Sequence, residues 1–146
     1  MKLGRYKALG VVTAVVIAAA AVVAWAMGGC TTPIETAAGG QMPMKCHWTM
    51  IAVVMVEAMG AFSALGLAFV KCKIGRRWLA CGGVLAQILA LLALHTSLMG
   101  LCGDTTMHCH TTALVVTAIS VVAVVLCVVA AALADPKRAE LPKRGL

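Results

Sequence analysis

Residues 113–134 read ALVVTAISVVAVVLCVVAAALA, a run of 22 residues without an acidic or basic side chain. A transmembrane helix needs about 20 consecutive apolar residues, at a rise of about 1.5 Å per residue. Similar runs occupy residues 8–28, 48–70 and 78–101. Backbone N–H and C=O groups in lipid must pair within their own segment, so each run is predicted to be a helix despite its many β-branched valines.

The composition of the whole chain agrees with this interpretation. Of its 146 residues, 62% are hydrophobic and 12% are charged, and the mean hydropathy is +1.01, whereas soluble domains have about 45–50% apolar and about 25% charged residues. Four spans leave no room for a soluble catalytic domain, and short alternating strands that would indicate a barrel are missing from the sequence. The predicted fold is an all-α membrane protein, a four-transmembrane-helix bundle that forms one integral membrane domain over residues 1–146.

The basic residues predict the orientation of this bundle. Eleven of the twelve lie before the first span, between the second and third spans, or after the fourth: Lys2, Arg5, Lys7, Lys71, Lys73, Arg76, Arg77, Lys137, Arg138, Lys143 and Arg144. By the positive-inside rule, both termini and the central loop are cytoplasmic, in the cytoplasmic (inner) membrane. The net charge of +7 is thus a topology signal, and no nucleic-acid partner is expected. The first span is longer than the apolar region of an ordinary signal peptide, so we expect it to be retained.

An internal repeat relates the two halves, about residues 1–71 and 72–146. Spans one and three end in an M-G-x-C motif, and spans two and four begin in an M-x-C-H-x-T motif. These motifs are MGGC at 27–30, MGLC at 99–102, MKCHWT at 44–49 and MHCHTT at 107–112. The pattern predicts two tandem helical hairpins related by a pseudo-two-fold axis along the membrane normal, a parallel repeat.

With these two M-x-C-H-x-T motifs and its four-span layout, the chain resembles the DUF4418 family of small bacterial and archaeal membrane proteins. The resemblance implies the fold and the membrane location, and it implies no particular reaction. It suggests a transporter permease as a partner, in addition to the lipid bilayer. Gly60 and Ala64 form a small-residue face in span two, which favours helix contacts within the bundle or between copies of a homo-oligomer.

Four of the seven cysteines are predicted at the outer, extracytoplasmic face: Cys30, Cys46, Cys102 and Cys109. That side of the membrane permits disulfides. The repeat favours one bridge per hairpin, Cys30–Cys46 and Cys102–Cys109, among the three connectivities that four cysteines allow. The remaining cysteines are interpreted as reduced or buried thiols without a role of their own.

The same outer cluster offers soft metal ligands. The candidates are Met44, Cys46, His47, Met107, His108, Cys109 and His110. Two Cys-His pairs brought together by the pseudo-two-fold would form a Cys₂His₂ set for Zn(II), and the thiolates and thioethers also suit Cu(I). Haem with histidine axial ligands is a less favoured alternative.

Two classes of function stay open. The first is a non-enzymatic membrane protein whose outer cluster is stabilised by disulfides or binds metal, as an accessory to a transporter. The second is a membrane thiol–disulfide oxidoreductase, or a quinone- or haem-linked redox protein, whose cysteine pairs cycle. We prefer the first, because neither pair has C-x-x-C spacing and the sequence contains no P-loop, H-E-x-x-H, nucleophile elbow or Rossmann motif. No catalytic residue is assigned.

Three polar residues interrupt the apolar spans: Glu57, Gln87 and His95. Glu57 lies about 15 Å below the outer end of its span, near the midplane. Such residues usually face the bundle interior, so Glu57 is expected to meet Gln87 or His95, with Thr117 and Ser120 as weaker candidates. The favoured role is interhelical hydrogen bonding, and the alternative is a proton path from the outer cluster through His95 to Glu57.

Overall fold

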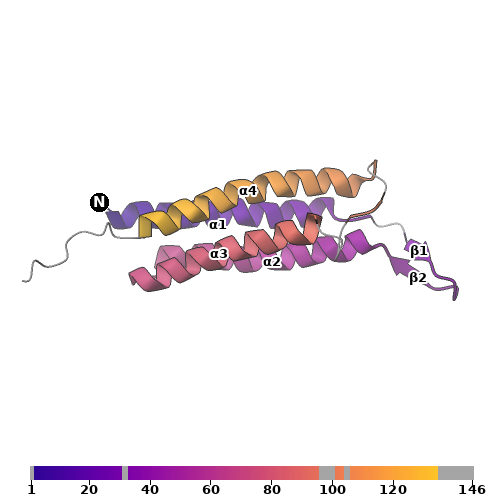
Figure 1. The fold of residues 1–146 in the computed structure, drawn as a ribbon, viewed down its shortest axis with the longest axis horizontal. Helices are drawn as coiled ribbons and strands as arrows, with labels where there is room; N and C mark the ends of the chain where they lie inside the picture. The colour runs from indigo at the N-terminus through magenta and orange to yellow at the C-terminus, as the bar shows by residue number, and fades with distance from the viewer. Residues whose placement is uncertain (1, 31–32, 96–100, 104–105, 135–146) are drawn as a thin grey trace, which may run out of the picture.

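The computed structural model describes residues 2–30, 33–95, 101–103 and 106–134. Its elements in chain order are α1 (Lys2–Met27), β1 (Pro33–Glu35), β2 (Gln41–Pro43), α2 (Lys45–Phe69), α3 (Lys73–His95) and α4 (His108–Ala134). All four helices are long and apolar enough to cross a membrane, and they lie side by side in an elongated bundle (Figure 1). The predicted fold, a multi-pass membrane protein made of four helices, is confirmed.

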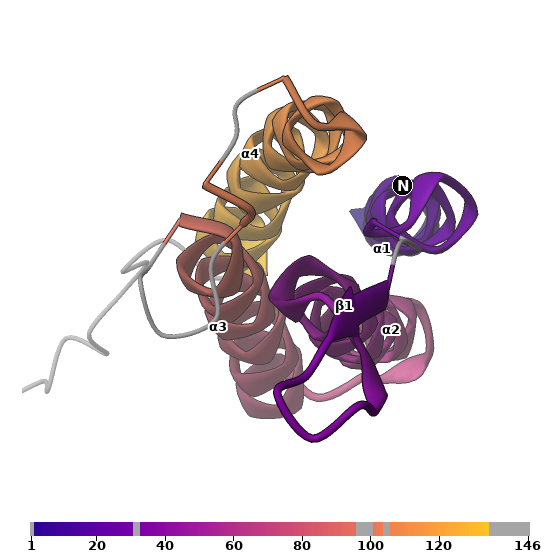
Figure 2. The same ribbon diagram turned by 90° about the vertical axis from the view of Figure 1, so that its right-hand side faces the viewer.

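The helices follow one another around the bundle. Consecutive helices pack together, and α4 closes the ring against α1. Viewed along the bundle, α1 lies opposite α3 and α2 lies opposite α4 (Figure 2). This order is compatible with two tandem hairpins, while the pseudo-two-fold between them stays a prediction.

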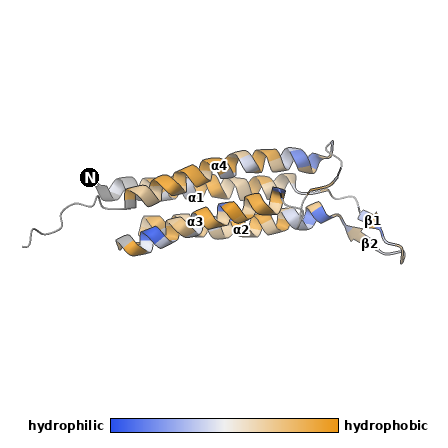
Figure 3. Cartoon of the chain, in the orientation of Figure 1, coloured by the Kyte–Doolittle hydropathy of each residue, from blue (hydrophilic) through white to orange (hydrophobic). Residues whose placement is uncertain are grey.

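The surface and the interior differ as expected for a protein in lipid. Large apolar side chains such as Val22, Met59 and Phe62 are exposed on the outside, and hydrophobic residues cover the length of the helices, with hydrophilic residues near their ends (Figure 3). Alanine dominates the buried positions. Small residues let helix backbones approach closely where no hydrophobic effect drives helices together, and at Gly10 an added Cβ would lie 3.1 Å from the backbone nitrogen of Ala68.

The tryptophans mark the two ends of the bundle. Trp25 lies in the last turn of α1 and Trp48 in the first turn of α2, at one end, and Trp78 lies near the start of α3, at the other. All three side chains are exposed. Exposed tryptophans at both ends of a helical bundle are typical of the two membrane–water interfaces.

The helices extend beyond the apolar runs that predicted them. α2 begins at Lys45 and α4 at His108, rather than at residues 48 and 113, so both M-x-C-H-x-T motifs enter the first helical turns. A polar residue ends an apolar run but does not end a helix, because backbone hydrogen bonds continue outside the hydrocarbon layer. The predicted third span extends to residue 101, but residues 96–100 lie outside the described part of the chain.

A small antiparallel hairpin between α1 and α2 was not predicted. β1 pairs with β2 in the register Pro33↔Pro43, Ile34↔Met42 and Glu35↔Gln41. Its turn is closed by a 2.7 Å hydrogen bond from the Thr36 N–H to the Gly40 carbonyl, with Gly39 at a φ of +76°. The hairpin extends past the end of the helices (Figure 1), and three-residue strands are too short to show a period in the sequence.

Candidate metal centre

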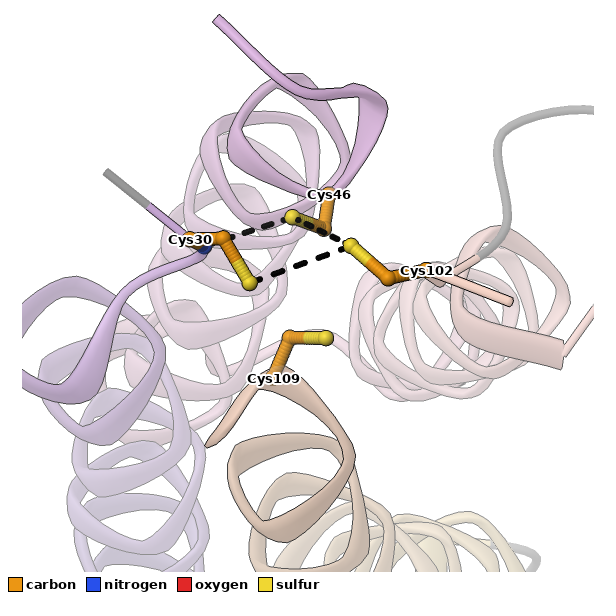
Figure 4. Close-up of side chains that lie close together, drawn as sticks. All are labelled: Cys30, Cys46, Cys102 and Cys109. Carbon is orange, nitrogen blue, oxygen red and sulfur yellow. Dashed lines mark hydrogen bonds between the residues drawn. The ribbon is translucent and has the colours of Figure 1, made fainter. Parts of the chain in front are cut away.

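Four thiols converge at the end of the bundle that carries the β-hairpin. The Sγ atoms of Cys30, Cys46, Cys102 and Cys109 all lie within 4.8 Å of one another. They come from four different places in the chain and point toward a common centre (Figure 4). We call these four residues the tetrathiol cluster.

A pair of glycines brings Cys30 to this centre. Gly28 ends α1 in the left-handed conformation, with a φ of +60°, and its N–H donates to the Ala24 carbonyl. Gly29 then lies against the start of α2, where an added Cβ would come within 2.6 Å of the Cys46 carbonyl oxygen. Only glycine fits such an approach. As a result the Cys30 N–H donates to the Cys46 sulfur at 3.3 Å.

Two helix starts supply the buried thiols. Cys46 and Cys109 are each the second residue of their helix, and neither is exposed to solvent. The first turn is the same in both: the N–H of the histidine that follows the cysteine donates to the carbonyl of the methionine three residues before that histidine, at 3.0 Å. The positive end of a helix dipole therefore faces the cluster from two helices, which stabilises negative charge there.

A short sulfur contact joins the two hairpins. Cys46 Sγ lies 3.1 Å from Cys102 Sγ, and Cys30 Sγ lies 3.8 Å from Cys102 Sγ. All four cysteines carry free thiols in this structure. The pairing predicted within each hairpin, Cys30–Cys46 and Cys102–Cys109, thus stays a prediction, because the cluster brings together partners for all three connectivities.

Among the described residues, the group that could hold a metal ion consists of the four cysteines and includes no histidine, so the Cys₂His₂ set stays a prediction. Successive residues of an α-helix point about 100° apart, so a helix that directs Cys46 inward turns His47 sideways, where its ring contacts Trp48 at 5.7 Å. His110 has its Nε2 2.9 Å from the Cys102 carbonyl oxygen. This bond holds the backbone of Cys102 beside the start of α4. His108 is exposed.

Two methionines add an outer layer of sulfur. Met107 Sδ lies 3.5 Å from Cys30 Sγ, and Met44 Sδ lies 3.9 Å from Cys102 Sγ. Each methionine therefore approaches the cysteine of the other hairpin. Both were predicted as candidate ligands, and the structure places both beside the cluster.

The surroundings of Cys102 disfavour its ionised form. Desolvation by burial, together with hydrogen bonds to the thiols of Cys46 and Cys30, raises the pKa of the Cys102 thiol above its usual range. A cation at the centre would reverse this, because a metal ion deprotonates a coordinating thiol.

Glu57 has two hydrogen-bond partners, one from each of two other helices. Its Oε2 accepts from Gln87 Nε2 at 2.6 Å and its Oε1 from Ser120 Oγ at 2.9 Å. All three side chains are fully buried. The sequence predicts Gln87 as one of two preferred partners of Glu57, and Ser120 as a weaker candidate.

His95 is hydrogen bonded elsewhere. Its Nε2 lies 3.0 Å from Thr117 Oγ1, and its side chain is exposed. The structure therefore gives His95 a partner on α4 and gives Glu57 partners that do not include His95. Both residues make interhelical hydrogen bonds, and their role beyond these bonds stays a prediction.

Two contributors to the site were missed from the sequence. Gly29 and the carbonyl of Cys102 have roles that depend on contacts between segments, and the only local signal was the M-G-x-C motif that contains Gly29. The other three cysteines lie apart from the cluster, with Cys72 and Cys81 exposed and Cys127 buried in α4.

Comparison with known proteins places the chain in a family. The model of the family described as "Domain of unknown function (DUF4418)" matches residues 10–134, which include all four cysteines of the cluster. No curated protein and no solved structure matches the chain. The match covers most of the sequence, so the chain belongs to the DUF4418 family.

Proposed function

We propose that the protein binds one Zn(II) ion in the tetrathiol cluster. The observation that carries the proposal is the set of four Sγ atoms within 4.8 Å of one another. With Zn–S bonds of about 2.3 Å, the sulfurs of a tetrahedral Zn(II) site lie about 3.8 Å apart. The Cys30–Cys102 separation of 3.8 Å has this value, so small side-chain movements would suffice to close the site.

The chemistry of the cluster favours a metal of this class. Four sulfur ligands in a tetrahedron are typical of zinc or iron–sulfur sites. A cluster of several irons is larger than one ion and needs more widely spaced thiols, and haem iron takes only axial ligands from the protein rather than four converging thiols. The excess negative charge of four thiolates is offset by the two helix N-termini at Cys46 and Cys109.

The ion would tie together the ends of all the helices. Cys46 and Cys109 lie in the first turns of α2 and α4, Cys30 follows α1, and Cys102 lies between α3 and α4. A closed four-ligand site of this kind is structural, and its binding energy adds to the stability of the fold. The basic residues Lys7, Lys71 and Arg76 lie at the opposite end of the bundle, so on this proposal the site is extracytoplasmic.

Metal analysis of the whole protein, purified in detergent with reductant, tests the proposal. We expect about one zinc per chain. Substituting Cys46→Ser and Cys109→Ser together should abolish binding, because two of four ligands are lost. The control is Cys81→Ser, which removes an exposed thiol of α3 and should leave the zinc content unchanged.

Two results would contradict the proposal. One is a reduced and folded protein that takes up no zinc from a buffered solution. The other is zinc that stays bound in the double cysteine variant, which would place the ion elsewhere.

The 3.1 Å contact between Cys46 and Cys102 favours a second candidate, reversible disulfide formation. Two thiols would lose two electrons and two protons to an acceptor such as a quinone and form one bridge. Counting free thiols in protein isolated without reductant separates the two functions. A zinc site gives seven titratable thiols after denaturation with chelator, and a cycling pair gives a mixture of seven and five.

A further inference from the structure

Two methionine sulfurs lie beside two of the cysteine sulfurs at the outer edge of the cluster. Cys30 Sγ lies 3.8 Å from Cys102 Sγ and 3.5 Å from Met107 Sδ. Cys102 Sγ lies 3.9 Å from Met44 Sδ. We propose that these four residues, Met44, Cys30, Cys102 and Met107, bind Cu(I). This inference rests on the proposed function in one respect: Cys30 and Cys102 belong both to the tetrathiol cluster and to the Cu(I) ligand set.

The charge of the ligands distinguishes the two sets. Cu(I) in four thiolates would leave one more negative charge than Zn(II) in the same thiolates. Thioethers are neutral, so two cysteines and two methionines hold a monovalent ion with little excess charge. Thioether sulfur is also a soft ligand, which suits Cu(I), whereas zinc sites in proteins use cysteine, histidine and carboxylate ligands.

Burial orders the sulfurs from outside to inside. Met44, Cys30, Cys102 and Met107 are all half-buried, and Cys46 and Cys109 are fully buried. An ion that arrives from solvent therefore meets the mixed cysteine–methionine set before it meets the inner thiols. The exposed Met42 of β2 lies in the same part of the molecule without a sulfur contact to the cluster among the contacts of the described residues.

The crossed arrangement of the methionines supports a built site. Met44 precedes α2 but contacts the cysteine of the second hairpin, and Met107 precedes α4 but contacts the cysteine of the first. Each methionine also packs against the buried core at this end. Both thioethers are thus held in place by the fold before any ion binds, which lowers the cost of ordering them.

The experiment compares two metals on the same variants. Cu(I) affinity is measured by competition with a chromophoric Cu(I) chelator, without oxygen and with thiols reduced, and Zn(II) affinity is measured with a zinc indicator. The test variant is Met44→Leu with Met107→Leu, in which leucine keeps nearly the same volume. The matched control is Met42→Leu with Met59→Leu, two exposed methionines.

We expect Cu(I) affinity to fall at least about tenfold in the test variant, with Zn(II) affinity within about twofold and no change in the control. The reverse pattern is expected for Cys46→Ser with Cys109→Ser: zinc binding is lost and Cu(I) binding persists. An unchanged Cu(I) affinity in the methionine variant would overturn the second set, and so would an equal loss of both metals.

The two proposals fail in different ways. Wild-type protein that binds Cu(I) through the methionines but no Zn(II) would overturn the tetrathiolate zinc site alone. Loss of Cu(I) in the inner double cysteine variant would place Cu(I) among the four thiolates and overturn the mixed set alone. Folding of each variant is checked by its helix content and its elution volume in detergent.

Discussion

Glu57 shows how one polar residue can be accommodated inside an apolar bundle. Each of its carboxyl oxygens accepts one hydrogen bond, from Gln87 on α3 and from Ser120 on α4. A polar group left alone in hydrocarbon costs several kcal/mol. The carboxyl group therefore connects α2 to two other helices at mid-depth.

Substitution of Glu57 tests its role in interhelical hydrogen bonding. We expect Glu57→Gln to keep the stability within about 1 kcal/mol, because Gln87 Oε1 has no hydrogen-bond partner among the described residues and can accept from the introduced amide. Glu57→Leu leaves Gln87 and Ser120 without their partner and should cost about 1–3 kcal/mol. Thermal unfolding in detergent measures both. An equal loss in the two variants would show that a neutral amide cannot replace the carboxyl group in these hydrogen bonds.

Zinc binding should depend on pH through the thiols of the cluster. Burial raises the pKa of Cys102, so this thiol is protonated at neutral pH in the metal-free protein and must release its proton to bind zinc. Affinity should therefore fall as the pH is lowered, by about tenfold per pH unit for each proton released. Titrations at three pH values measure this slope, and a flat profile would exclude thiols as the ligands.

The ends of the secondary-structure elements build the cluster. α1 ends at a left-handed glycine, and α2 and α4 each begin one residue before a cysteine. The middle parts of the helices only set the distance between these ends. A shift of one residue at a helix start would turn its cysteine by about 100° and remove it from the centre.

Gly29 is the position where this dependence can be tested. An added Cβ would lie 2.6 Å from the Cys46 carbonyl oxygen and 2.7 Å from the His47 nitrogen, both backbone atoms, so the start of α2 must move. We expect Gly29→Ala to weaken zinc binding at least about tenfold while the helix content stays the same. Zinc affinity and circular dichroism are the measurements.

Gly103→Ala is the matched control. Gly103 follows Cys102 directly, and an added Cβ there meets nothing within 4 Å. The zinc affinity of the Gly103→Ala variant should equal that of the wild type. If both alanine variants bind zinc normally, the close approach at Gly29 does not position Cys30.

At the scale of the whole molecule, the sequence was sufficient for the architecture. Hydropathy predicts spans because a bilayer imposes one length and one secondary structure on every crossing. The cysteines of the cluster were also predictable, because the repeat places them at corresponding helix ends. Their exact partners were not, since the tilt and rotation of packed helices decide whether Cys46 meets Cys30 or Cys102. The direction of His47 follows from helix geometry once the helix start is known.

The orientation of the bundle in the membrane decides which pool of metal reaches the cluster, and it can be tested with an impermeant thiol reagent on intact cells. The turn of the β-hairpin offers Ala37, which is exposed at the cluster end, and the opposite end offers the native, exposed Cys72. Gly75 is a poor position for an introduced cysteine, because an added Cβ would lie 2.7 Å from Cys72 Sγ.

The split of eleven basic residues against one predicts that Ala37→Cys, made together with Cys72→Ser, is labelled in intact cells. Cys72 of the wild type should be labelled only after the cells are permeabilised, and the Cys72→Ser variant should lose that signal. Labelling of Cys72 in intact cells, with none at position 37, would invert the orientation. The tetrathiol cluster would then face the reducing cytosol, where zinc binding would be favoured over disulfides, so this result decides between the two chemistries of the four cysteines as well as the topology.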